Sequence, residues 1–549
     1  MLIKPFPARV AAERVVLAII LIVALGLRMR GVAFGLPGLY DPDEPIFMLC
    51  ALKLLRDHTL NPGWFGHPGS TTIYVMAIVE ASTFLIGHWL GYFPTQAAFI
   101  ESIYRDPGIV FLPGRLFIVA CSVGCVAFTY LIARRLCGAG TALLAAGILA
   151  VDALHIQWSQ VIRTDVHASL FMLASLWFAI GIAQRGRLLE YLGAGAMAGL
   201  ACATKWPAAT IIAATIGAAT LAMMKDRVSS GRHVRMLGMA LVAMVLATIA
   251  ASPYLLLDYP TVAANLGGDG QAHHLGATGG TFFENMVWYV AHPLRDTLGV
   301  TGLAMLLVGI VAVLRQARLS VATLLLPAIV FFVAIASQHL IWARWIVPIM
   351  PMIAILVAIG MGCIVAWLRA HIPPAPVIML TMALAAILLL PMLRATQSAA
   401  AERANDTRVI AVRWITANVA RDETIAVEHF AFNLSQAGYR IIFPAGQAGC
   451  VDAMALLNRR VSYAQTGRIR GNVGLADFGT VPTAVQSTCR AGVVMVTDLD
   501  RYLAESETYP SEIAAYRRIL AGGRLVAIVR PIIGRVGGPA VRIYRLPLR

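Results

Sequence analysis

Charged residues that stand next to long apolar runs are the side chains of this sequence whose types and spacing could do chemistry. The segment Asp41-Pro42-Asp43-Glu44-Pro45 follows the first apolar run. Further charges stand at the ends of later runs, namely Arg163, Asp165, Lys205 and Arg344. Charges within or beside membrane spans are costly, so those that persist usually face a cavity or pair with one another. We therefore expect all of these residues to share one water–lipid boundary.

Such a grouping suits a definite chemistry. A carboxylate can accept the proton of a hydroxyl, and Arg or Lys can neutralise a departing phosphate without a metal ion. Pro45 fits the first turn of a predicted helix over 46–57, whose dipole would favour an ionised carboxylate at its amino end. The pattern favours an anionic lipid head group for the cations and a hydroxyl for a carboxylate.

Each of these residues also has a purely structural interpretation. Asp43 or Glu44 could simply cap the helix over 46–57. The cations could make local or interfacial contacts instead: Arg163 with Asp165, Lys205 extended to the surface from a helix end, and Arg344 as an anchor beside Trp342 and Trp345. The residue types alone leave these alternatives open.

Histidines are the remaining candidates for a ligand or proton-transfer role. His67 lies in Trp64-Phe65-Gly66-His67-Pro68-Gly69, and His273-His274 lies in the long segment 258–298. No H-E-x-x-H, C-x-x-C or comparable metal spacing accompanies them, so ordinary loop histidines are favoured and no metal ligand is assigned. The carboxylates are compatible with a divalent metal ion, but we predict no required cofactor. There is no P-loop, no G-x-G-x-x-G after a strand and no G-x-S-x-G elbow.

Composition identifies the environment of these residues. The chain has 549 residues, of which 59% are hydrophobic and only 13% charged, and its mean hydropathy is +0.75. Soluble domains carry about 25% charged residues, so this is an integral membrane protein. Its net charge of +16 falls partly in short basic turns, which membrane orientation explains, and no base-reading motif supports nucleic-acid binding. Eight cysteines over this length are too few for a disulfide scaffold.

The apolar runs predict about eleven membrane spans. The first is Val15 to Leu27, which we interpret as an uncleaved helix because no convincing signal-peptidase site follows it. The others are 113–136, 138–157, 166–184, 188–203, 206–224, 236–257, 299–315, 319–337, 345–368 and 376–394. Basic turns in alternate gaps mark one side as cytoplasmic: Arg134-Arg135, Arg185 with Arg187, Lys225 to Arg235, Arg315 with Arg318, and Arg369 with His371.

One apolar run breaks this alternation. Thr71 to Leu90 is apolar enough to span, but counting it would invert every later basic turn. We therefore predict that 70–91 dips into or lies along the outer leaflet. The amino terminus is then cytoplasmic, and the odd number of spans places the polar tail, residues 400–549, on the other side.

The tail predicts a small α/β domain. Helical spacing covers Glu402 to Ala420 and Ser511 to Leu520. Strands are expected at 424–427, 440–443, 493–497, 525–529 and 541–544. Its only cysteines are Cys450 and Cys489, for which a disulfide and free thiols are about equally compatible.

Taken in order, the motifs resemble those of polyprenyl-phosphate-sugar-dependent glycosyltransferases. The chain is similar to bacterial members of the protein O-mannosyltransferase family (glycosyltransferase family 39), and more distantly to the lipid A aminoarabinose transferases. The resemblance covers residues 10 to 395, and the tail looks like the extracytoplasmic domain of the bacterial members. It rests on these segments: Asp41-Pro-Asp43-Glu44-Pro, Trp64 to Gly69, Arg163-Thr-Asp165, Thr204-Lys205, His274 to Gly280, and Ala343-Arg344-Trp345 with Pro348 and Pro351.

The resemblance implies a fold and an activity. The expected fold is a helical polytopic C-type glycosyltransferase, with a membrane module over 1–398, surface or re-entrant helices in a first outer loop over 30–112, and an extracytoplasmic α/β domain over 399–549. Asp43 occupies the family's essential acid position and Glu44 that of its partner. The positions of the donor phosphate or a second acid fall on Arg163, Asp165, Lys205 and Arg344, with His67 and His274 beside the substrate.

The expected reaction is transfer of a sugar from a polyprenyl-phosphate donor to a hydroxyl of a protein, lipid or glycan acceptor, with inversion and without a nucleotide sugar. The resemblance implies a bacterial inner membrane with the tail in the periplasm. Two rivals remain: a multi-helix transporter or lipid flippase, which would place charges near the bilayer midplane and pair interrupted helices, and an assembly scaffold that displays its tail.

Overall fold

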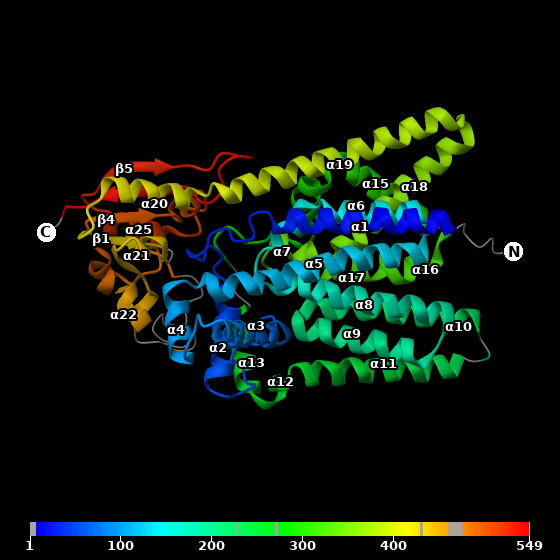
Figure 1. The fold of residues 1–549 in the computed structure, drawn as a ribbon, viewed down its shortest axis with the longest axis horizontal. Helices are drawn as coiled ribbons and strands as arrows, with labels where there is room; N and C mark the ends of the chain where they lie inside the picture. Colours follow the sequence, from blue (N-terminus) through cyan, green and yellow to red (C-terminus); the bar gives the residue numbers. More distant parts are fainter. Residues whose placement is uncertain are drawn as a thin grey trace.

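A long helical bundle carries a small sheet domain at one end (Figure 1). The computed structural model describes residues 7–226, 228, 230–269, 273–428, 432–458, 465 and 476–547. The predicted spans are helical, with breaks at 151–152 and 252–253. Their helices are, in order, α1 Pro7–Met29, α5 Gly108–Leu136, α6 Ala139–Ala150 with α7 Ala153–Ser159, α8 Thr164–Arg185, α9 Leu188–Thr204, η1 Trp206–Ile211 with α10 Ile212–Lys225, α11 Ser230–Ala251, α15 Arg295–Gln316, α16 Arg318–Ser320 with η3 Val321–Leu325 and α17 Leu326–Ala336, η4 Ala343–Ile349 with α18 Met350–His371, and α19 Pro374–Ala404.

The predicted membrane character of these helices is confirmed. Among the described residues, ten helices are long and apolar enough to cross a membrane, or eleven if the pair α6 and α7, bent by 58°, is one span. α9 is an apolar helix of 17 residues, shorter than the others. Helix α3, Ser70–Trp89, is included in the ten, although its direction differs from theirs.

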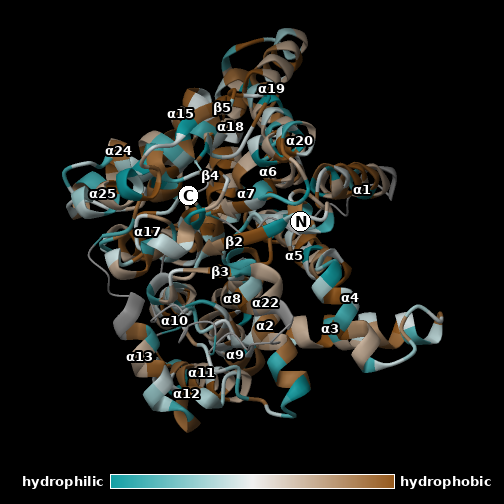
Figure 2. Ribbon diagram, turned by 90° about the vertical axis from the view of Figure 1, so that its left-hand side faces the viewer, coloured by the Kyte–Doolittle hydropathy of each residue, from teal (hydrophilic) through white to brown (hydrophobic). Residues whose placement is uncertain are grey.

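Helix α3 runs across the bundle rather than along it. Figure 1 shows α3 nearly end-on where α1, α5 and α8 lie lengthwise, and Figure 2 shows α3 lengthwise. Its outer side is apolar and exposed, with Ile78, Leu85 and Trp89 among the exposed large side chains. A helix that lies in the plane of a membrane surface has this orientation and this apolar face. The predicted exception at 70–91 therefore agrees with the structure.

The remaining surface helices lie at the same end of the bundle. In the first outer loop they are α2, Glu44–Arg56, and α4, Gln96–Arg105. Helix α12, Tyr254–Leu257, lies just before the segment expected as a loop over 258–298. Within that segment, α13, Tyr259–Asp269, is followed by α14, Phe282–Tyr289, and η2, Val290–Leu294, which continue into α15 up to a kink at Gly299. The expectation of a loop up to residue 298 was therefore wrong: Thr281 and Glu284 form a capping box that starts the helix at Phe282.

Close contact between backbones fixes the helix that follows Arg344. A Cβ atom added at Gly309 of α15 would lie 2.0 Å from the carbonyl oxygen of Leu356, and one added at Gly360 of α18 would lie 2.0 Å from that of Met305. Small residues allow helices in a membrane to approach in this way. The glycine pair therefore sets the position of α18, whose amino end leads into η4 and Arg344.

The tail forms the expected mixed domain. Its six strands are β1 Thr424–Val427, β2 Arg440–Pro444, β3 Cys450–Asp452, β4 Val493–Val496, β5 Arg524–Val529 and β6 Val541–Arg545, in the sheet order β3-β2-β1-β4-β6-β5. β1 pairs in parallel with β2 and β4, whereas the other pairs are antiparallel. The helices of the domain are α20 Thr407–Asn418, α21 Phe432–Gln436, α22 Ala453–Asn458, η5 Gly446–Ala448, η6 Thr483–Cys489, α24 Leu499–Ala504 and α25 Pro510–Ile519.

Two details of the tail differ from what its sequence predicts. The helix expected over Glu402 to Ala420 is divided, because α19 continues from the membrane to Ala404 and α20 begins only at Thr407. Asp406 caps α20 by accepting a hydrogen bond from the backbone N–H of Arg408. The strand β3 was not predicted; it begins at Cys450, which forms a disulfide with Cys489.

Candidate functional site

The two aspartates of the loop that leads into α2 differ in their contacts with the backbone. Asp41 Oδ1 accepts hydrogen bonds from the backbone N–H groups of Asp43 (3.0 Å) and Glu44 (3.2 Å). Asp43 is the residue that precedes α2, but its own side chain makes no capping hydrogen bond. The capping role that the sequence offered for Asp43 is therefore taken by Asp41, and the Asp43 carboxylate is left for other partners.

Those partners are two arginines from distant parts of the chain. Arg163, which precedes α8, donates from Nη1 to Asp43 and from Nη2 to both oxygens of Asp41, at 2.8 and 2.9 Å. Nη2 of Arg344, in η4, lies 3.5 Å from Asp43 Oδ2. The Asp43 side chain is 30% exposed, whereas those of Arg163 and Arg344 are 5% and 9% exposed. Asp43 is thus the group of this cluster that solvent reaches.

A second ion pair lies beside the first. Lys205, which ends α9, donates to Asp165 in the first turn of α8, and both side chains are buried. The local pairing of Arg163 with Asp165 that the sequence allowed is not formed, because Arg163 turns to Asp41 and Asp43. Asp165 interacts electrostatically with Arg344 as well as with Lys205, which links the two pairs.

One indole ring lies near both arginines. The guanidinium carbon of Arg163 lies 5.5 Å from the ring centroid of Trp158 in α7, and that of Arg344 lies 5.8 Å from the same ring. Arg344 also lies over Trp342, at 4.6 Å. Cations over aromatic faces are stabilised by the ring quadrupole, which helps to hold two like charges close together. Trp158 was not predicted as part of the site.

Glu44 lies apart from this cluster. It is fully buried and accepts hydrogen bonds from Arg115 Nε and Nη2, at 2.8 and 2.6 Å, and from the backbone N–H of Ile162, at 2.9 Å. Arg115 also donates to the carbonyl oxygens of Val32 and Phe34. The carboxylate of Glu44 is therefore occupied by structural partners, and its bond to Ile162 fixes the residue next to Arg163.

The predicted histidines border the site as neutral rings. Burial, together with the positive charges of Lys205 and Arg344, lowers the pKa of His67 to about 3. Its ring centroid lies 5.2 Å from that of Trp64 and 6.3 Å from that of Phe47. His274 lies against Trp342, at 5.0 Å between ring centroids, and burial lowers its pKa as well. At neutral pH neither ring adds positive charge to the site.

The backbone at His67 and Pro68 is hydrogen-bonded to the loop that carries Lys205. The backbone N–H of Trp206 donates to the His67 carbonyl oxygen at 2.7 Å, and Pro68 forms a bridge with Lys205.

Within the described ranges, no group of three or more His, Cys, Asp or Glu side chains is placed to hold a metal ion. The arrangement therefore offers one solvent-accessible carboxylate beside three buried cations.

Comparison with known proteins places this geometry in context. Residues 96–256, which include Arg115, Arg163, Asp165 and Lys205, match the family model described as dolichyl-phosphate-mannose-protein mannosyltransferase. No curated protein matches the sequence. The family match confirms the resemblance found in the motifs and the predicted class of enzyme, a membrane glycosyltransferase.

Solved structures establish the fold. ArnT from Cupriavidus metallidurans in the apo state is 13% identical, with 98% of each chain covered and a TM-score of 0.55. The same protein bound to undecaprenyl phosphate gives 13%, 98% of each chain and 0.52. The apo oligosaccharyltransferase of Archaeoglobus fulgidus is 13% identical over 93% of this chain and 73% of that one, with a TM-score of 0.52. The predicted C-type glycosyltransferase fold is confirmed.

Proposed function

We propose that this membrane glycosyltransferase moves one sugar from a polyprenyl phosphate to an acceptor hydroxyl on the outer face of the membrane, with inversion at the anomeric carbon. The observation that carries the proposal is the position of Asp43, a partly exposed carboxylate held between Arg163 and Arg344. Asp43 can accept a proton while Arg163 and Arg344 hold an anion, and the reaction requires both. ArnT from Cupriavidus metallidurans, with the same fold, has been solved with undecaprenyl phosphate bound.

The reaction assigns a task to each charged group. The acceptor oxygen attacks the anomeric carbon while the bond from that carbon to the phosphate oxygen breaks, and its electron pair leaves with the lipid phosphate. Asp43 accepts the hydroxyl proton. Arg344, whose contact with Asp43 is the longer one at 3.5 Å, turns to the phosphate as negative charge develops there. The remaining N–H donors of Arg163 and Lys205 face the same charge.

Asp43 is a weak base in these surroundings, because two guanidinium groups stabilise its ionised form. A weak base suffices if the proton leaves late, after the sugar–phosphate bond has largely broken. The membrane aligns the donor, so little orientational entropy remains to be lost when it meets the acceptor. Glu44 acts only through structure, since its carboxylate is buried against Arg115.

The positions of the site residues and of the basic turns support a site that faces away from the cytoplasm. In Figure 1 the amino terminus lies at one end of the bundle and the sheet domain at the other. Arg134 and Arg135 lie in the last turn of α5, Arg315 lies in the last turn of α15, and Arg318 begins α16. These helix ends share the end of the bundle with the amino terminus, which the positive-inside tendency assigns to the cytoplasm. Site residues stand at helix ends, as Arg163 and Lys205 do, whereas a transporter would place them near the midplane.

The test is a donor panel. The purified protein in lipid nanodiscs is incubated with polyprenyl phosphates that carry different labelled sugars, together with candidate protein, lipid and glycan acceptors. We expect one donor to yield free polyprenyl phosphate and a labelled product whose anomeric configuration is inverted. A parallel assay follows passage of the same lipids across the bilayer. Lipid passage without sugar transfer from any donor would contradict the proposal in favour of a flippase.

Arg344→Ala is expected to weaken handling of the donor phosphate. A hydrogen bond to a charged group contributes about 1.5–3 kcal/mol, so kcat/KM for the donor should fall about tenfold to a hundredfold. The matched control is Arg369→Ala, in the basic turn at the opposite end of α18, which should leave these kinetics unchanged. Unchanged donor kinetics in Arg344→Ala, with a lowered melting temperature, would reduce Arg344 to a structural anchor.

A further inference from the structure

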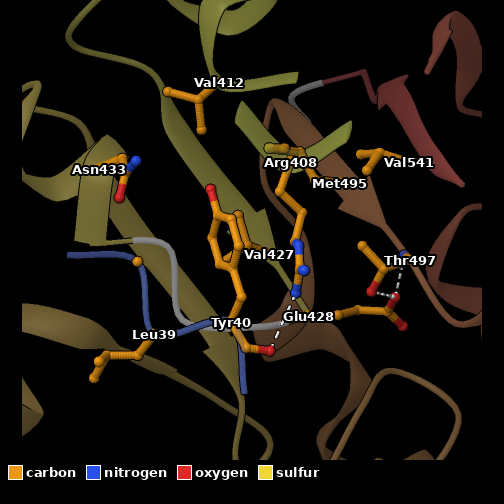
Figure 3. A pocket seen from close by; sticks show the side chains of 11 residues that line it. Leu39, Tyr40, Arg408, Val412, Val427, Glu428, Asn433, Met495, Thr497 and Val541 are labelled. Carbon is orange, nitrogen blue, oxygen red and sulfur yellow. Dashed lines mark hydrogen bonds between the residues drawn. The ribbon is translucent and has the colours of Figure 1, made fainter. Parts of the chain in front are cut away.

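A pocket lies in the tail, where the sheet meets the first outer loop. β1 pairs with β2 on one side and with β4 on the other, all in parallel, so the chain leaves β1 in one direction and returns to its other side. In open sheets, ligands bind in the crevice beyond the carboxyl ends of strands at such a switch point. Glu428 follows β1 and Thr497 follows β4 directly. Both residues line the pocket (Figure 3).

The first outer loop contributes part of the lining of this pocket. Its residues there are Gly38, Leu39 and Tyr40. Arg408 of α20 donates to the carbonyl oxygen of Tyr40 at 3.2 Å, and its guanidinium carbon lies 3.9 Å from the centroid of the Tyr40 ring. Tyr40 directly precedes Asp41, which holds Arg163. The pocket is therefore attached to the loop that carries the proposed catalytic acid.

Two polar atoms in the pocket lack partners. The hydroxyl of Tyr40 and the Oδ1 atom of Asn433 are buried and accept or donate no hydrogen bond within the described part of the chain. Figure 3 shows both side chains at the same side of the pocket. An unsatisfied buried polar atom costs about 1–3 kcal/mol. A ligand that hydrogen-bonds to both atoms would remove this cost.

The charged groups of the pocket already have hydrogen-bond partners. Arg408 donates to both oxygens of Asp406, each at 2.8 Å. Glu428 accepts hydrogen bonds from the hydroxyl of Thr497 at 2.9 Å, from the backbone N–H of Asp498 at 2.8 Å, and from Tyr516. Neither charged side chain is therefore left free to bind an ion. Its free groups are one pure acceptor, Asn433 Oδ1, and one hydroxyl that both donates and accepts.

These free groups favour a sugar over a peptide. The other lining residues include apolar side chains, namely Val412, Val427, Met495 and Val541. An uncharged ring that carries hydroxyls can contact such walls and also satisfy both polar atoms. One common way of holding a peptide is through main-chain bonds to a free strand edge, but β1 and β4 are paired on both sides. No such edge is open where the pocket lies.

We propose that this pocket binds an uncharged sugar ring of the acceptor, through the Tyr40 hydroxyl and Asn433 Oδ1, while another part of the acceptor reaches Asp43. This inference rests on the proposed transfer reaction and names the acceptor as one that already carries a sugar. Binding energy from a part of the substrate that does not react can be used to orient the part that does. The pocket would then select acceptors and position them at the same time.

The test uses methyl glycosides of neutral sugars as probes, with the full-length protein in nanodiscs. We expect at least one glycoside to raise the melting temperature, because a ligand that binds only the folded state stabilises it. Loss of one hydrogen bond costs about 1 kcal/mol, so Tyr40→Phe and Asn433→Leu should each weaken binding about fivefold. Tyr92→Phe is the matched control, since Tyr92 is 74% exposed in the same outer loop, and it should bind like the unaltered protein.

This experiment distinguishes an effect on folding from an effect on glycoside binding or on sugar transfer. Without ligand, Tyr40→Phe should melt no lower than the unaltered protein, because it removes a buried hydroxyl that has no partner. Asp43→Asn should keep glycoside binding and lose transfer; retained transfer would contradict the catalytic proposal and leave the pocket standing. The pocket proposal is overturned if no glycoside binds, if the two pocket variants bind like the control, or if a peptide binds there instead.

Discussion

Asp43→Asn is expected to lower the rate of sugar transfer by about a hundredfold to ten-thousandfold, the range over which a positioned acid or base contributes. The amide keeps the shape of the side chain but cannot take the hydroxyl proton. It also removes the negative charge that Arg163 and Arg344 face. The measurement is single-turnover transfer from a labelled polyprenyl-phosphate donor, in which binding and chemistry are separated.

The matched control for this variant is Asp57→Asn. Asp57 lies at the end of α2, in the same outer loop, and pairs with the exposed Arg56. Its substitution should leave transfer unchanged, because surface pairs contribute little. Both variants should melt within a few degrees of the unaltered protein. If Asp43→Asn retained more than about a tenth of the rate, below the loss that acid–base catalysis implies, Asp43 would not be the base.

Arg115→Met is expected to destabilise the protein by about 3–5 kcal/mol, because removing one partner of a buried pair leaves an uncompensated charge. Glu44 would keep only its bond to Ile162 N–H, and the carbonyl oxygens of Val32 and Phe34 would lose their donor. Since Ile162 precedes Arg163, transfer should fall together with stability. Thermal unfolding in nanodiscs and the transfer assay on the same preparation measure both effects.

The pair itself is tested by a double-mutant cycle. Glu44→Gln with Arg115→Met removes both charges, so the double variant should be less destabilised than the sum of the single variants. Arg105→Met is the matched control, because Arg105 pairs with Glu101 at the surface, where their side chains are 79% and 56% exposed; it should cost less than about 1 kcal/mol. Strict additivity, or an equal loss in the control, would show that the Glu44–Arg115 pair does not hold the loop.

The sequence motif does not reveal that the carboxylates of Asp43 and Glu44 have different surroundings. The two carboxylates are adjacent in sequence and were expected to act together. At the start of α2 their side chains point in different directions, so one meets the arginines at the surface and the other enters the core. Asp41, from the same motif, supplies the cap and the bidentate contact with Arg163 that the sequence did not assign.

Arg115 and Trp158 were also not predicted, for different reasons. Arg115 stands within an apolar run, and a charge in that position is itself a signal of a buried partner. It was not among the predicted site residues. Trp158 carried no such signal. An aromatic residue near the end of a span is common at membrane interfaces, and the contact of Trp158 with both Arg163 and Arg344 forms only in the folded chain.

The sequence by itself determined the membrane class, the helical segments and most strands of the tail, because hydropathy, basic turns and residue alternation are local properties of the chain. It also determined which charges were candidates, since a charge at the end of an apolar run is costly wherever the fold places it. Only the tertiary structure decided the pairing: Arg163 with Asp41 and Asp43, Lys205 with Asp165, and Glu44 with Arg115. The physical reason is that ion pairs form between side chains that helix packing brings within a few ångströms, and separation along the chain does not encode that distance.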